Sequence, residues 1–330
     1  MLKIWQKKKF LAYLLWPLSF IYRIFIFVRR KFYQFHFLKI NYLSIPVIVV
    51  GNITIGGTGK TPVVIALALF LKEKGWRPGI ISRGYGGNTK HFPCLVHQNS
   101  NAREVGDEPI LIARHTGCPT MIDPDRSRGA KSLLKRSNCN IVISDDGLQH
   151  LSLGRDIEII VVDGERRFGN NFCLPAGPLR EPISRLNSVD FVISKGIAQT
   201  NEFKLCLIPD YFYQLIQTKN KQSKEYFLEK KVHAVAGIGN PDQFFKALRK
   251  LGLNIIEHPF PDHYLFKPRD FNYGSDAIII MTEKDAVKCV GFVDARLWCL
   301  RTKTALDNNF LNTILNRINL INKNLKSSSS

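Results

Sequence analysis

The chain has 330 residues, of which 45% are hydrophobic, and its 47 basic and 27 acidic side chains give a formal net charge of +20. This length and composition exclude a disordered or repetitive protein and leave room for two domains with cores of their own. Seven scattered cysteines form no C-x-x-C pair and no spacing typical of metal ligands, which favours a reduced compartment.

The first 44 residues contain basic and apolar side chains but no acidic one. The apolar run at 10–28 predicts a helix. On this helix and its flanks one narrow stripe is free of large apolar side chains, and it consists of Lys8, Ala12, Ser19, Arg23, Arg30 and Gln34. No small-residue cleavage site follows, which argues against a signal peptide, and Pro17 and Arg23 interrupt a membrane span. We favour a helix in the membrane interface, with its apolar side in the acyl boundary and its Lys and Arg among lipid phosphates. A spanning helix and a helix buried in the core are the alternatives.

The charge excess is compatible with nucleic acid, an anionic membrane or a polyanionic substrate. No recognised nucleic-acid reading module is present in the sequence. We therefore expect contact with a membrane surface and no nucleic-acid partner.

A short β-branched run at 47–50 leads into "GNITIGGTGKTPVV", and residues 60–74 then predict a helix. A strand, a glycine-rich loop and a helix that begins with Lys-Thr form a P-loop, which holds nucleotide phosphates on backbone amides. The expected nucleotide-binding residues are Thr54, Ile55, Gly56, Gly57, Thr58, Gly59, Lys60 and Thr61. Lys60 would reach the β- and γ-phosphates and Thr61 would ligate Mg²⁺. Thr54 departs from the usual pattern, which has glycine there, and a chance glycine-rich turn is the alternative.

Acidic residues follow at two further positions. Asp107 and Glu108 of "VGDEP" precede a short helix, and from sequence alone Asp107 is best interpreted as a helix cap. A strand predicted at 141–144 ends in Asp145 and Asp146, as a Walker B strand does, where a carboxylate holds Mg²⁺ directly or through water. Acidic residues that merely open a solvent-exposed turn are the alternative.

Further strands predicted at 79–82, 157–162 and 191–194 alternate with helices and end in polar residues. This pattern predicts an α/β protein of the P-loop NTPase type, with a doubly wound, mostly parallel sheet and the site along one edge. The expected divisions are a membrane-associating helical segment at 1–44, a P-loop domain at 45–215 and a smaller α/β domain at 216–330, with a hinge near 216–231.

Eight sequence blocks stand in order along the chain: "GNITIGGTGKTP", "SRGYGG", "VGDEP", "DDGLQH", "LPAGPLREP", "AGIGNPDQFF", "PDHYLF" and "TEKDAVK". Together they resemble the tetraacyldisaccharide 4′-kinase family, the lipid A 4′-kinases of Gram-negative bacteria, from the N-terminal helix to about residue 290. Thr54 agrees with this family, which carries Thr or Ser there. Leu148 stands where the family more often has an aromatic residue, and the tail after Leu300 resembles nothing recognisable.

The resemblance implies an ATP- and Mg²⁺-dependent kinase that phosphorylates the 4′-hydroxyl of tetraacyldisaccharide 1-phosphate to form lipid IVA in lipopolysaccharide synthesis. It implies an enzyme at the cytoplasmic face of the bacterial inner membrane, peripheral or held by an N-terminal anchor.

The resemblance also assigns roles to individual residues. Lys60 and Thr61 would hold the phosphates and Mg²⁺, with Asp145 and Asp146 as the metal-side carboxylates. Asp107 would be the general base on the acceptor hydroxyl and His263 of "PDHYLF" its partner. Arg180 and Glu181 of "PLREP" would contact phosphate or the acceptor sugar.

Two rival functions come from other classes. A P-loop GTPase or metallochaperone-like switch at the membrane needs an N-K-x-D element; residues 194–196 lack it and "TEKD" at 282–285 imitates it only loosely. A membrane scaffold with a vestigial P-loop is disfavoured by the intact Lys60, Thr61 and Asp-Asp-Gly sequence.

Overall fold

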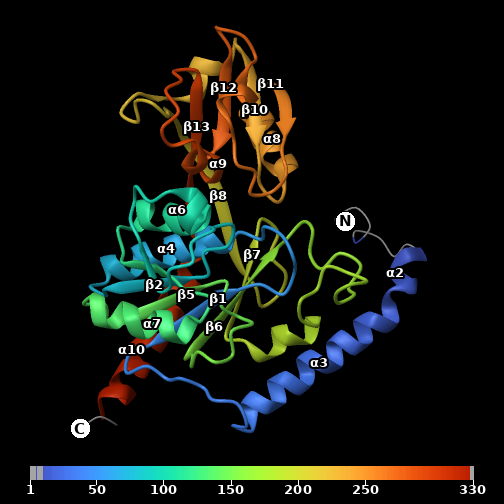
Figure 1. Ribbon diagram of the computed structural model, residues 1–330, viewed down its shortest axis with the longest axis vertical. Coiled ribbons are helices and arrows are strands. Elements are labelled where there is room, and N and C mark those ends of the chain that lie inside the picture. The colour runs from blue at the N-terminus through green and yellow to red at the C-terminus, as the bar shows by residue number, and fades with distance from the viewer. Residues whose placement is uncertain (1–4, 6–9, 328–330) are drawn as a thin grey trace.

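The computed structural model describes residue 5 and residues 10–327. It has a larger lobe, a smaller lobe above it and a long helix along one flank of the larger lobe (Figure 1). One sheet runs through both lobes in the order β11-β10-β12-β13-β8-β7-β6-β1-β5-β2-β4-β3, with β9 paired to β8.

The sheet of the larger lobe is parallel except at one edge. Its strands are β1 (Val47–Gly51), β2 (Pro78–Ser82), β3 (Cys94–Val96), β4 (Thr120–Ile122), β5 (Ile141–Asp145), β6 (Ile157–Asp163) and β7 (Phe191–Lys195). Only the edge pair β3–β4 is antiparallel among these strands. The central strands are buried on both faces, which explains why they read as continuous apolar runs.

Helices cover both faces of this sheet. On one face, α4 (Lys60–Glu73), α6 (Asp107–Thr116) and α10 (Asn308–Ser327) bury apolar side chains against the strands. On the other face lie α7 (Arg126–Arg136) and the long segment 164–189, which includes the 3₁₀ helix η1 (Ile183–Ser188). The short helix α5 (Ala102–Val105) precedes α6. The predicted doubly wound, mostly parallel α/β fold is confirmed.

Two long antiparallel strands join the lobes, β8 (Phe203–Gln214) and β13 (Leu297–Leu306). At its start β8 pairs with β7 of the larger lobe, and its far end pairs with β9 (Lys221–Gln222) of the smaller one. The polar stretch 216–231, expected as a hinge, lies within the smaller lobe, where Phe227 is fully buried in the core. Helix α10 follows the smaller lobe in sequence but packs in the core of the larger one. The expected boundaries at residues 44/45 and 215/216 stay predictions.

The smaller lobe is a second α/β unit. It contains β10 (Lys231–Ala236), β11 (Asn254–Pro259) and β12 (Ile278–Thr282), with α8 (Pro241–Lys250) and α9 (Glu283–Ala286). The 3₁₀ helices are η2 (Lys224–Phe227), η3 (Pro268–Phe271) and η4 (Val287–Cys289). Separate apolar clusters fill the two faces of its sheet.

The N-terminal segment forms α2 (Phe10–Leu14) and α3 (Trp16–Gln34) where one helix was expected. The break lies at Leu15, next to Pro17 in the first turn of α3. Ala12 and Ser19 of the predicted stripe are buried against the larger lobe, whereas the aromatic and aliphatic side chains face outward. Lys8 lies outside the described residues. Among the residues that the structure describes, no helix is long and apolar enough to cross a membrane.

Candidate active site

The P-loop follows β1 and ends at the first residue of α4. Gly56 and Gly59 have positive φ angles of 94° and 97°, a conformation that glycine adopts readily and other residues do not. The buried Asn52 side chain braces the loop from inside by donating to the Gly56 carbonyl (3.4 Å) and the Thr58 hydroxyl (3.2 Å). The loop is therefore held in one shape before nucleotide binds.

The predicted nucleotide-binding residues are not equivalent in the structure. Thr54 is buried and bridges to Leu179, and the amide of Ile55 donates to the carbonyl of Pro178 (2.9 Å). These two residues tie the loop to the segment 176–180. The remaining predicted residues, Gly56 to Thr61, form the turn and the first residues of α4.

Lys60 and Arg180 meet at one carboxylate. Lys60 Nζ lies 3.5 Å from Asp146 Oδ1, and Arg180 Nη1 lies 3.2 Å from Asp146 Oδ2. Burial alone would raise the pKa of Asp146, but these two cations outweigh it and hold the pKa below its ordinary value. Asp146 also has a positive φ of 48°, and such strained conformations are concentrated at functional sites. The "PLREP" arginine thus reaches the P-loop lysine through a shared partner.

Asp145, at the end of β5, is in a different state from its neighbour. It is 1% exposed, and its Oδ2 accepts a hydrogen bond from the Ser82 hydroxyl (3.1 Å) at the end of β2. Its Oδ1 has no hydrogen-bond partner among the described residues. Burial, followed by the charges of Glu108 and Asp146, raises the pKa of Asp145 to about 7. A buried carboxylate with a free oxygen among like charges is suited to a cation.

Arg126 adds positive charge beneath the two aspartates. It is the first residue of α7 and almost fully buried, and its Nη1 donates to the carbonyl of Asp123 (2.6 Å). Burial lowers the pKa of this guanidinium to about 10, which still leaves it charged at neutral pH, and Asp145 and Asp146 favour that charged form.

Asp107 and His263 come from different lobes and contact each other. His263 Nδ1 lies 3.2 and 3.1 Å from the two carboxylate oxygens of Asp107, and Asp107 is 3% exposed. Burial is the largest single influence and favours the neutral forms of both groups. Their hydrogen bond and the surrounding opposite charges together outweigh it, which lowers the pKa of Asp107 and raises that of His263. The pair is therefore biased toward an ionised Asp107 and a protonated His263.

The glycine-rich loop 83–87, which follows β2, packs against the Asp107–His263 pair. The rings of Tyr85 and His263 meet edge to face with centroids 5.0 Å apart. Gly106, directly before Asp107, has a φ of 86°, and a Cβ there would lie 2.4 Å from the carbonyl oxygen of Tyr85. Any larger residue at 106 would push the loop and the pair apart.

Glu181 connects the site to the N-terminal helix. It is buried and accepts a hydrogen bond from Gln149 (2.8 Å), whose amide also donates to the carbonyl of Asn52 (3.1 Å). On its other side Arg185 lies 3.3 Å away and Arg30 of α3 lies 4.0 Å away. Arg29 likewise donates to the backbone of Gln149 (3.1 Å). Arg29 and Arg30, expected among lipid phosphates, thus contact the protein, and contact of this segment with lipid stays a prediction.

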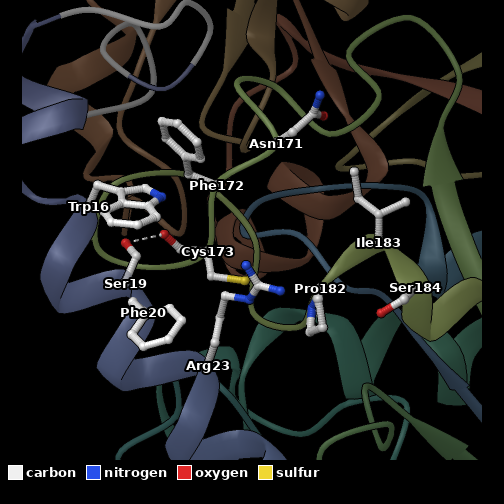
Figure 2. Close-up of a pocket in the computed structure, with 10 residues that line it drawn as sticks. All are labelled: Trp16, Ser19, Phe20, Arg23, Asn171, Phe172, Cys173, Pro182, Ile183 and Ser184. Atoms are coloured by element: carbon white, nitrogen blue, oxygen red, sulfur yellow. Dashed lines mark hydrogen bonds between the residues drawn. The ribbon is translucent and has the colours of Figure 1, made fainter.

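A cavity of about 240 Å³ lies beside this connection, between α3 and the segment 171–184. Figure 2 shows Trp16, Ser19, Phe20 and Arg23 on the α3 side, with the Ser19 hydroxyl bonded to the carbonyl of Cys173 at 2.8 Å. Its opposite wall is formed by residues 182–184, directly after Glu181. The lining is mixed: Ser19, Asn171 and Ser184 are polar, Arg23 is charged, and the other lining residues are apolar.

The structure brings Lys60, Asp145, Asp146 and Arg180 to the strand ends of the larger lobe, and it brings Asp107 and His263 together across the lobes. Sequence reasoning missed Ser82, Arg126 and Lys284, whose Nζ lies 2.9 Å from Glu108. Ser82 and Lys284 stand inside the blocks "SRGYGG" and "TEKDAVK", so a strand-end position was the signal available for both. The "TEKD" aspartate, Asp285, pairs with Lys288 and accepts from the Gly237 amide, so it is engaged within the smaller lobe.

Comparisons with known proteins agree with this geometry. The family profile of tetraacyldisaccharide-1-P 4′-kinases matches residues 11–319. The match extends beyond residue 290, where the recognisable sequence blocks end, and includes most of α10.

Curated relatives cover nearly the whole chain. A tetraacyldisaccharide 4′-kinase of Coxiella burnetii is 47% identical over 96% of this chain and 94% of its own. One of Nitrosococcus oceani is 47% identical over 94% and 91% of the two chains. Among solved structures, LpxK from Aquifex aeolicus in complex with ATP superposes with a TM-score of 0.79 and is 31% identical, covering 93% of this chain and 99% of its own.

Proposed function

The chain belongs to the tetraacyldisaccharide-1-phosphate 4′-kinase family, and from this premise we propose that it transfers the γ-phosphate of ATP to the 4′-hydroxyl of an acylated glucosamine disaccharide 1-phosphate, giving lipid IVA. It is a phosphotransferase of lipid A synthesis with an alcohol as acceptor. The observation that carries the proposal is the contact between Asp107 and His263, in which an imidazole of the smaller lobe holds a buried carboxylate that could act as a base. The switch hypothesis requires no such pair.

In this proposal each residue of the site has one task. Lys60, at the start of α4, holds the β- and γ-phosphate oxygens, and Arg126 and Arg180 neutralise charge nearby. Asp107 accepts the proton of the 4′-hydroxyl. At the same time the hydroxyl oxygen bonds to the γ-phosphorus, and the bond between that phosphorus and the ADP oxygen breaks. His263 holds the carboxylate in place and stabilises its charge. Arg180 would contact phosphate, and Glu181, buried against Gln149 and Arg185, would hold the segment that carries Arg180.

The residues present fit Mg²⁺. The free Oδ1 of Asp145, the carboxylate of Asp146 and the hydroxyl of Thr61 are oxygen donors of the type that Mg²⁺ prefers. Burial and the nearby charges of Glu108 and Asp146 disfavour the ionised form of Asp145 and raise its pKa. A divalent cation would stabilise that ionised form. Mg²⁺ bound there would supply neutralisation of phosphate charge. The absence of a basic partner for Asp145 Oδ1 among the described residues supports this assignment.

The lipid substrate would approach along the N-terminal helix. Outward-facing side chains of α3 such as Phe25 (66% exposed) and Ile21 (62% exposed) form an apolar face suited to the acyl boundary of a bilayer. The cavity between α3 and the segment 171–184 would receive part of an acyl chain, next to the residues that lead to Arg180 (Figure 2). We place the protein at the inner leaflet of the bacterial inner membrane, at its cytoplasmic face.

One incubation tests the function. The purified protein, ATP, Mg²⁺ and tetraacyldisaccharide 1-phosphate in mixed micelles should give a bisphosphorylated lipid, detected by mass spectrometry. GTP hydrolysis without the disaccharide, and no phosphorylated lipid, would favour the switch hypothesis instead. No turnover of either nucleotide would favour the scaffold.

A further inference from the structure

Lys284 occupies the space between the two segments that carry Asp107 and His263. It lies in α9 of the smaller lobe, and its Nζ is 2.9 Å from Glu108 Oε1 and 3.6 Å from Asp262 Oδ1. Glu108 follows Asp107 directly in α6, and Asp262 directly precedes His263. One ammonium group thus bonds the chain neighbours of both members of the pair.

We propose that Lys284 is a positioning residue that cross-links these two segments and so sets the geometry of the Asp107–His263 pair. The proposal rests on the function above, because the pair matters only if it serves phosphoryl transfer. Lys284 itself contacts neither carboxylate oxygen of Asp107 nor the imidazole in the hydrogen bonds found among the described residues, so it acts through its partners.

The local charges make such a cross-link necessary. The carboxylates of Asp107, Glu108 and Asp262 gather at this point of the lobe interface, and each would repel the others without a cation between them. His263 also has a positive φ of 60°, a conformation that persists only where surrounding contacts impose it. Lys284 supplies both a counter-charge and a tether.

The other end of α6 offers a matched control. There His115 Nε2 lies 3.0 Å from Glu283 Oε1, and Arg301 Nη1 lies 2.6 Å from the same carboxylate oxygen. This second cluster also joins α6 to the smaller lobe, yet it contains neither Asp107 nor His263 nor a chain neighbour of them. If the lobe interface alone mattered, losing Arg301 would have the same effect as losing Lys284.

The test compares Lys284→Met, Lys284→Arg and Arg301→Met in the full-length protein. A misplacement on the order of 1 Å can cost about a hundredfold in rate, so we expect Lys284→Met to lower kcat about 10- to 100-fold with the KM for ATP nearly unchanged. Lys284→Arg should recover most of the loss, and Arg301→Met should keep kcat near that of the original protein. In an Asp107→Asn background, Lys284→Met should lower kcat no further.

Hydrogen exchange of the backbone amides at 260–267 gives a readout that does not need turnover. It should be faster in Lys284→Met and unchanged in Arg301→Met. Unchanged kcat and exchange in Lys284→Met would overturn the proposal, and so would a raised KM for ATP with normal kcat, which would mean direct phosphate binding. If the original protein transfers no phosphate to the lipid, the proposed function fails, while the exchange comparison alone still decides whether Lys284 holds the two segments together.

Discussion

His263 Nδ1 lies 3.1 Å from Asp107 Oδ2 although 156 positions separate them in the chain and each belongs to a different lobe. Asp107 and His263 therefore form a pair only when the lobes are in contact, and we propose that they act as base and partner. We expect Asp107→Ala and His263→Ala each to lower kcat by about a hundred- to ten-thousandfold, with little change in the KM for ATP. Because the two act as one unit, the double variant should be far less impaired than the product of the single effects, as steady-state kinetics on the three variants would show.

The same variants test the alternative role for Asp107. Gly106 holds the N-cap position of α6 and no side chain among the described residues caps the helix, so the interpretation of Asp107 as the helix cap is wrong. Asp107 is the first residue of α6, and its Oδ1 accepts from the amide of Glu108 (2.8 Å). If this contact were its whole purpose, Asp107→Ala would cost about 1 kcal/mol of unfolding free energy and leave kcat nearly intact. Thermal melts recorded beside the kinetics distinguish the two roles.

The pKa of His263 should depend on Asp107. Burial and the charge of Lys284 both lower this pKa. The hydrogen bond to Asp107, with the charges of Asp107 and Asp262, raises it above its ordinary value of 6.5. We therefore expect Asp107→Asn to bring the pKa of His263 below 6.5, measured by NMR of the imidazole. Because the folded-state pKa is raised, the pair's contribution to stability is complete below about pH 6.5 and is lost as the pH rises through the folded-state value. In Asp107→Asn that loss should disappear from the pH dependence of unfolding.

Removing the charge of Asp145 should make the protein more stable but less active. Its pKa is raised from 3.8 to about 7, so the folded protein retains a proton that the unfolded chain releases, and stability falls as the pH rises from about 4 to 7. At pH 8 without Mg²⁺, Asp145→Asn should therefore melt at a higher temperature than the original protein, yet lose most of its transfer activity. Mg²⁺ should raise the melting temperature of the original protein more than that of the variant. Equal melting temperatures at pH 8 would contradict the buried-charge argument.

Lys60→Ala should abolish phosphate transfer while the protein remains folded. The lysine is partly exposed and its ion pair with Asp146 spans 3.5 Å, so its loss removes a phosphate ligand without opening the core. Circular dichroism would report the fold, and a fluorescent ATP analogue the binding. Near-normal turnover would show that the P-loop does not hold the transferred phosphate.

The outward face of α3 should control binding to lipid. Replacing Ile21, Phe25 and Val28 with serine removes exposed apolar area without touching the buried Ser19 contact, and should weaken sedimentation with anionic vesicles and raise the KM for lipid more than that for ATP. Serine at Ile197 and Val293, exposed apolar residues away from the N-terminal helices, provides the control. Vesicle binding unaffected by the α3 changes would exclude this face as the membrane contact.

The local features of the fold could be predicted from the sequence because short-range chemistry determines them. The β-branched run and the glycine-rich loop predicted the bounds of β1 and the first residue of α4 to within one residue. This was possible because turn, cap and strand preferences act over a few positions. The crossing between the lobes was not predicted, because β8 and β13 pair across more than eighty residues and neither contains a distinctive motif. Residues 216–231 are polar in composition, yet tertiary packing buries Phe227 among them.

The candidate site likewise contains residues that the sequence identifies and residues that only the fold identifies. Lys60, Asp145 and Asp146 stand in motifs whose chemistry is known, the P-loop and the Walker B strand. Ser82 and Lys284 stand in recognised blocks and Arg126 in none, but the role of all three depends on what the fold places beside them. The basic N-terminal segment shows another limit of composition. Its charge suggested lipid phosphates as partners of Lys and Arg, but it gave no sign that Arg29 and Arg30 contact Gln149 and Glu181 of the protein.

The packing of α10 has a consequence for how the protein is made. Phe310, Ile314 and Ile318 are fully buried against α4 and the central strands, yet the ribosome adds them only after the entire smaller lobe has been synthesised. Domains generally fold as units, from the N-terminus onward, as the nascent chain emerges. We therefore expect the core of the P-loop half to stay incomplete, with apolar side chains of α4 uncovered, until α10 leaves the exit tunnel. Nascent chains of this protein therefore offer chaperones a hydrophobic surface on the nucleotide-binding half until α10 has been added.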